Sequence, residues 1–146
     1  MQVRDIMTTR VITVRMDDSL FMVKERLERL EVHHLLVLEN KKIVGIISDR
    51  DFLRASSPYL NTPAETTRDT NLMNRPAHQI MSRNPITIEA DASAQDAAQT
   101  MLENNVSCLP VINEEKQLEG LLTSRDLMGC FAEGCQKTKN QAAVQA

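Results

Sequence analysis

The sequence contains the same segment twice, and this duplication constrains the fold more than any other feature. Ile6-Met7 recurs 74 positions later as Ile80-Met81, and Arg50-Asp51 recurs 75 positions later as Arg125-Asp126. One residue has therefore been added to the second copy. Its expected place is segment 113–116, because Asn, Glu and Lys there are typical of a turn, where an insertion costs least. The self-similarity predicts two copies of one structural unit.

Both copies carry the same pattern of secondary structure. The elements predicted for the first copy are a helical turn at 4–7, a strand at 11–14, an amphipathic helix, strands at 35–38 and 43–47 around a hairpin turn, and a helix from Ser48. The amphipathic helix has Asp17 or Asp18 as its expected N-cap and an apolar stripe of Leu20, Val23, Leu27 and Leu30. The second copy repeats these elements. Neither copy, at roughly 50 residues, is expected to bury its apolar faces alone, so the two should pack sheet to sheet with pseudo-twofold symmetry.

These boundaries divide the chain into two motifs, a linker and a tail. The expected ranges are 1–56 for the first motif, 57–76 for the linker, 77–132 for the second motif and 133–146 for a polar, mobile C-terminal tail. Within the linker, Thr62 as N-cap, Pro63 at N1 and Glu65 at N3 predict the start of a short helix.

Composition excludes several classes of protein. A net charge of −3 argues against a nucleic-acid partner, which a basic face would indicate. No apolar run is long enough to span a membrane, and residues 1–15 show no signal peptide. The odd count of three cysteines indicates reduced thiols in a cytoplasmic protein, and Cys130 and Cys135 lack the second ligand pair that a zinc site needs. We expect neither a bound metal nor contact with membranes or nucleic acid.

Motifs at matching places in both copies resemble the CBS (cystathionine β-synthase) domain family. They are Gly-Ile-Ile-Ser-Asp-Arg-Asp at 45–51, Gly-Leu-Leu-Thr-Ser-Arg-Asp at 120–126, and Leu-Pro-Val-Ile at 109–112. The resemblance covers most of residues 3–56 and 77–131 and is strongest to stand-alone bacterial proteins that consist of a CBS pair. It implies an α+β fold of α/β-type repeats, in which two β-α-β-β-α motifs form one module.

The resemblance also implies a function. Pairs of this family bind adenine-containing ligands (AMP, ADP, ATP or S-adenosylmethionine) in clefts between the motifs, and they commonly dimerise through their helices. The chain is thus expected to be a regulatory ligand sensor that is not an enzyme and requires no cofactor. It would form a homodimer and signal to an unidentified effector protein.

Two patterns, Ser48-x-x-Asp51 and Thr123-x-x-Asp126, allow two interpretations. One is a capping box that closes a helix N-terminus. The other is a ligand site, in which the hydroxyl donates to phosphate, the carboxylate accepts from ribose hydroxyls, and Gly45 or Gly120 lets the ligand approach the backbone.

Similarity to the AMP-binding regulatory subunits of the AMP-activated kinase implies two pockets. The pocket around Asp126 would hold Thr8, Val11, Thr13, Val32, His33, His34, Thr123 and Arg125. The pocket around Asp51 would hold Ser82, Pro85, Thr87, Val106, Ser107, Ser48 and Arg50. In each pocket two apolar residues would sandwich the base: Val11 with Val32, or Pro85 with Val106.

The two pockets differ in charge. His33-His34 stands where family members often keep a basic pair for phosphate, whereas the second copy has Ser107-Cys108. This difference predicts tighter binding of a phosphorylated ligand beside Asp126. The alternative is that His33 and His34 are only a polar entry to a strand, and Arg50 and Arg125 only solvated surface charges.

Two other functions remain open. An enzyme would have to use His33-His34 with Cys108, a combination that matches no catalytic motif. A homodimeric interaction scaffold with empty or degenerate pockets is the stronger alternative. Apolar helix positions that could serve it are Phe52, Leu53, Leu127, Met128 and Phe131.

Overall fold

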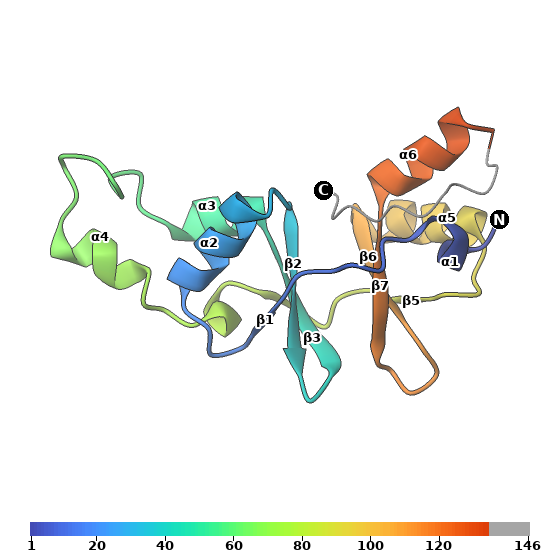
Figure 1. Ribbon diagram of the computed structural model, residues 1–146, viewed down its shortest axis with the longest axis horizontal. Coiled ribbons are helices and arrows are strands. Elements are labelled where there is room, and N and C mark those ends of the chain that lie inside the picture. Colours follow the sequence, from blue (N-terminus) through green and yellow to red (C-terminus); the bar gives the residue numbers. More distant parts are fainter. Residues whose placement is uncertain (135–146) are drawn as a thin grey trace.

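The duplicated sequence folds into two sheets that face each other, each covered by helices on its outer side (Figure 1). The computed structural model describes residues 1–134. The first sheet has the order β1 (Thr13–Arg15), β2 (His34–Glu39), β3 (Lys42–Ser48), β4 (Ser82–Arg83), and the second the order β5 (Ile88–Glu89), β6 (Cys108–Ile112), β7 (Leu118–Thr123). The helices are α1 (Val3–Ile6), α2 (Leu20–Arg29), α3 (Asp49–Ala55), α4 (Thr67–Leu72), the 3-10 turn η1 (Ala77–Gln79), α5 (Ala94–Asn104) and α6 (Ser124–Ala132). The predicted α+β fold of two packed motifs is confirmed.

The hairpins show where the second copy gained its residue. β2 and β3 are antiparallel and joined by Asn40 and Lys41, both with positive φ (53° and 67°), as a tight hairpin turn requires. In the second copy the loop between β6 and β7 is longer. Asn113 stabilises it, because its side-chain oxygen accepts hydrogen bonds of 2.9 Å from the backbone N–H groups of both Glu115 and Gln117. The extra residue is therefore absorbed in this loop, as predicted.

The first segment of each copy packs on the other copy. The N–H of Val3 donates to the carbonyl of Ala92 (2.8 Å), and at the equivalent positions the N–H of Ala77 donates to the carbonyl of Asp18 (2.7 Å). Val3 belongs to the core of the second motif, and Ala77 to the core of the first. In Figure 1 the chain accordingly crosses the middle of the molecule twice, once after α1 and once before β5. Each motif therefore holds the first segment of the other copy, and this exchange of segments links the two motifs.

Glycine makes this exchange possible. A Cβ added at Gly45 would overlap the side chain of Met81, and a Cβ at Gly120 would lie 2.7 Å from the backbone oxygen of Thr8. Met81 and Thr8 belong to the exchanged segments. The hypothesis that these glycines admit a ligand is therefore wrong: protein atoms fill the space beside them.

Each motif has its own apolar core between sheet and helices. α2 buries Leu20, Val23 and Leu27 as predicted, but Leu30 lies at its C-cap and is exposed. The expected N-cap at Asp17 or Asp18 is also wrong. Ser19 caps the helix, and the carboxylate of Asp18 instead accepts a hydrogen bond from the N–H of Arg15 (2.7 Å) in the preceding turn.

The linker helix begins four residues later than predicted. Thr66 caps α4, and Asp69 completes its capping box. The side chain of Glu65 accepts instead from the N–H of Asn61 (3.1 Å) and closes a turn. The later start is favoured because Asp69 also accepts a 2.7 Å hydrogen bond from the hydroxyl of Ser57, which ties α4 to the end of the first motif. Of the predicted mobile tail, residues 135–146 lie outside the described residues.

Candidate functional site

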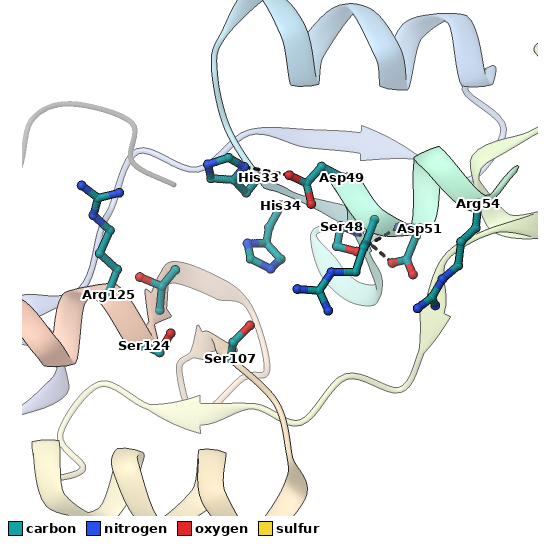
Figure 2. Close-up of a pocket in the computed structure, with 11 residues that line it drawn as sticks. His33, His34, Ser48, Asp49, Asp51, Arg54, Ser107, Ser124 and Arg125 are labelled. Carbon is teal, nitrogen blue, oxygen red and sulfur yellow. Dashed lines mark hydrogen bonds and ion pairs between the residues drawn. The ribbon is translucent and has the colours of Figure 1, made fainter. Parts of the chain in front are cut away.

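A cavity of about 480 Å³ lies between the two motifs, where β3 and β7 end and α3 and α6 begin (Figure 2). Its lining comes from both copies: His33, His34, Ser48, Asp49, Arg50, Asp51 and Arg54 from the first, and Ser107, Thr123, Ser124 and Arg125 from the second. Residues expected in two separate pockets thus share one cavity. Asp49, Arg54 and Ser124 line it as well, and the sequence had not singled them out.

Three of the four residues that form the two capping boxes line this cavity: Ser48, Asp51 and Thr123. The hydroxyl of Ser48 accepts from the N–H of Asp51 (3.1 Å), whose Oδ2 accepts from the N–H of Ser48 (2.9 Å). Thr123 and Asp126 repeat this arrangement at 3.2 and 2.9 Å. The capping interpretation is confirmed. It does not exclude ligand binding beside Asp51, because Oδ1 of Asp51 accepts no hydrogen bond from the part of the chain that is described and can accept from a ligand hydroxyl.

Burial gives Asp126 an unusual carboxyl group. It raises the pKa of Asp126 above its ordinary value, while the hydrogen bonds from Thr123 and the charge of Arg125 partly oppose the rise. An ionised carboxylate in this position gains from any donor that replaces lost water.

The histidines differ in their surroundings. His33 Nδ1 lies 2.8 Å from Asp49 Oδ2, an ion pair when His33 is protonated, and Figure 2 shows the two side chains together at one edge of the cavity. Burial lowers the pKa of His34 below its ordinary value, although Asp49 partly opposes this, so the neutral ring is favoured near pH 7.

This arrangement changes the expected difference between the two carboxylates. The expectation of phosphate beside Asp126 rested on His33 and His34 as a basic pair. Both now line the same cavity as Asp51, one of them beside a carboxylate and the other favoured as a neutral ring. The histidines therefore do not distinguish the two sides of the cavity.

Three arginines supply the positive charge of the cavity. The guanidinium groups of Arg50, Arg54 and Arg125 have no hydrogen-bond or ion-pair partner within residues 1–134, and all three side chains are exposed. Arg50 and Arg54 are four residues apart on α3 and therefore share a face of the helix. That spacing was the sequence signal that could have identified Arg54.

The other expected pocket residues lie outside this cavity. They are Thr8, Val11, Thr13, Val32 and Asp126 from one set, and Ser82, Pro85, Thr87 and Val106 from the other. Thr8 and Ser82 pair with β7 and β3. The carbonyl of Thr13 accepts a hydrogen bond from Arg26 (2.7 Å).

Val32 lines a second cavity of about 630 Å³ that adjoins the first. The two cavities share His33, Asp49 and Arg125, and the second is bordered by apolar side chains that include Leu27 and Phe52. The polar cavity is thus continuous with a more apolar one.

Cys108 does not line either cavity. Burial raises the pKa of its thiol to about 12. The thiol is protonated at neutral pH and is a poor nucleophile, which removes the basis of the candidate catalytic group.

The fold and the cleft define a pair of repeated motifs with a cavity at their junction. The sequence model of the CBS domain matches residues 3–58 and 77–133. The chain belongs to the CBS domain family.

Curated relatives share this family. A CBS domain-containing protein of Dictyostelium discoideum is 34% identical over 128 residues, which cover 86% of this chain and 88% of the relative. An uncharacterised protein of Methanocaldococcus jannaschii is 36% identical over 93 residues, 61% of this chain but only 33% of that protein.

Solved structures agree with the fold. The CBS domain pair of protein MJ0100, in complex with 5′-methylthioadenosine and S-adenosyl-L-methionine, is 25% identical with a TM-score of 0.75 and covers 92% of this chain and 98% of that chain. CBSX2, in complex with AMP, also reaches a TM-score of 0.75 over 92% of this chain and 98% of that chain, at 23% identity, which shows the shared fold. No helix in residues 1–134 is long and apolar enough to cross a membrane.

Proposed function

We propose that this protein is a regulatory module that senses an adenine-containing ligand in the cleft between its two CBS motifs. The observation that carries the proposal is the cavity itself, which joins Ser48 and Asp51 of one motif to Thr123 and Arg125 of the other. A ligand in this place contacts both motifs and can therefore change how they sit relative to each other.

The chemistry of the cavity suits a nucleoside with charged or polar groups. The free Oδ1 of Asp51 can accept from ribose hydroxyls, and the unpaired guanidinium groups can donate to phosphate. The adjoining cavity beside Val32 and Phe52 offers apolar surface to the base. The complex of MJ0100 with two adenine-containing ligands supports the same ligand class.

The module works without catalysis, cofactor or metal, in the cytoplasm, and passes its signal to an effector protein. S-adenosylmethionine, AMP, ADP and ATP are its candidate ligands.

A homodimeric scaffold is the second candidate, and exposed apolar side chains favour it. Leu53 on α3 and Met128 on α6 occupy equivalent places in the two motifs and are 68% and 65% exposed. Phe131 is 75% exposed and lines an apolar groove of about 590 Å³ between α5 and α6. Phe52 was expected to belong to this surface but is buried in the first core.

A thermal-shift screen separates the two candidates. The panel is AMP, ADP, ATP, adenosine, 5′-methylthioadenosine and S-adenosylmethionine, with UMP as the control. A sensor gives saturable stabilisation by an adenine compound, about 2.7 kcal/mol at one hundred times the dissociation constant. If no adenine compound raises the Tm, the sensor proposal fails and the scaffold remains.

A further inference from the structure

Arg54 breaks the symmetry of the cavity. The repeat pairs Ser48 with Thr123, Arg50 with Arg125 and Asp51 with Asp126. The position equivalent to Arg54 is Gly129, which has no side chain. The first motif therefore brings two arginines to the cleft, and the second motif brings one.

The position of Arg54 places its charge beside Asp51. Figure 2 shows the two side chains next to each other on α3, at the side of the cavity away from Arg125. Arg50 precedes Arg54 by one helical turn, so two guanidinium groups without partners in the described chain stand on one face. These two guanidinium groups repel each other, the nearby carboxylate of Asp51 offsets only part of the repulsion, and a bound anion reduces it further.

Planar guanidinium groups suit phosphate. Each presents parallel N–H donors that match two phosphate oxygens, and each stays charged over the whole range of pH in which proteins fold. Three arginines line the cavity, Arg54 among them, but only two carboxylates do, Asp49 and Asp51. The charge left over is positive.

From these observations we propose that Arg54 is a specificity-determining residue that binds the phosphate of an adenine nucleotide beside Asp51. The inference rests on the proposed function and narrows it: on this side the cleft prefers a phosphorylated ligand to an uncharged nucleoside. Arg54 also stands in the last turn of α3, where a cation stabilises the helix dipole. A merely structural role of that kind would lower stability without changing ligand preference.

Calorimetry with AMP and adenosine at pH 8.5 tests the inference. Histidine is neutral at this pH and cannot account for a preference for phosphate. The variants are Arg54→Gln, Arg54→Lys and, as a matched control, Arg68→Gln on the exposed linker helix, outside the cleft. Arg54→Gln should lower the affinity for AMP by about tenfold or more and leave the affinity for adenosine unchanged. Arg54→Lys should restore part of the loss, and Arg68→Gln should bind as the wild type does.

Three results would overturn the inference, and they have different meanings. Equal losses for AMP and adenosine in Arg54→Gln would show that Arg54 only stabilises α3. Unchanged AMP affinity in Arg54→Gln would show that the phosphate lies elsewhere, while the proposed function stands. If the wild type binds neither compound, the proposed function fails, and the inference falls with it.

Discussion

Asp126 caps a helix and also has a raised pKa, and a single substitution can separate these two properties. Its Oδ2 caps α6 by accepting from the N–H of Thr123, while burial raises its pKa. Because the folded protein holds the Asp126 proton more tightly than the unfolded chain, this group makes stability fall as pH rises from the ordinary carboxyl range to the raised pKa. Above the raised pKa, the free-energy cost of keeping Asp126 ionised in the folded protein no longer changes with pH.

We therefore expect Asp126→Asn to keep the cap and to lose this dependence on pH. The amide oxygen can still accept from Thr123, whereas Asp126→Ala leaves a backbone donor unsatisfied at a cost of about 1–3 kcal/mol. Urea denaturation between pH 4 and 7 compares the three proteins. If the free energy of unfolding of Asp126→Asn changes with pH in parallel with that of the wild type, the raised pKa is not a property of this group.

The capping boxes were the part of the site that sequence could predict with most detail. Ser48-x-x-Asp51 and Thr123-x-x-Asp126 are local patterns, and the hydrogen bonds they predict depend on three consecutive peptide units. The merging of two expected pockets was not predictable in this way. Whether the two pockets merge depends on the distance between the motifs. That distance follows from contacts between the motifs and not from a local pattern within either one.

At the scale of elements, the exchange of first segments is the feature that local sequence could not assign. The helical turn near Ile6 was predicted, but its spacing is the same whether it packs on its own copy or on the other. In the structure it packs on the other copy, through contacts between residues far apart in sequence, such as the β-bridge between Thr8 and Leu121. Gly45 and Gly120 were the local signal, since each lies under an exchanged segment.

Exchanged segments lie against Gly45 and Gly120 but not against Gly129, so substitutions of these three glycines should have different effects. Gly120→Ala should cost about 1–3 kcal/mol, because the added Cβ meets the backbone oxygen of Thr8, which cannot move without breaking the bridge to β7. Gly45→Ala should cost less, because it meets the flexible side chain of Met81. Gly129→Ala on α6 meets nothing within 4 Å and should stabilise the protein by about 0.8–1 kcal/mol.

Chemical denaturation in guanidinium measures all three free energies of unfolding. If Gly120→Ala is as stable as Gly129→Ala, the first segment does not pack on β7.

At the scale of the whole molecule, Leu53, Met128 and Phe131 predict self-association. Leu53 and Met128 are related by the repeat, so a second copy of the chain can present the same pair in return and bury both. We expect Leu53→Asp combined with Phe131→Asp to weaken a dimer at least tenfold, because each buried side chain contributes about 1.5–3 kcal/mol.

Light scattering at tens of micromolar measures this assembly. Tyr59→Ser provides the control, because Tyr59 is 55% exposed but lies in the linker. A wild-type mass of one chain would contradict the prediction of a homodimer.

Binding in the cleft between the motifs is the central claim, and calorimetry with AMP on the wild type and on Asp51→Asn tests it most directly. The variant keeps an oxygen acceptor in the capping box of α3 and removes the charge of the carboxylate that lines the cavity. We predict saturable heat from the wild type and an affinity at least tenfold lower in the variant, because each charge-assisted hydrogen bond to ribose contributes about 1.5–3 kcal/mol. No heat from the wild type, or equal affinity in both proteins, would contradict it.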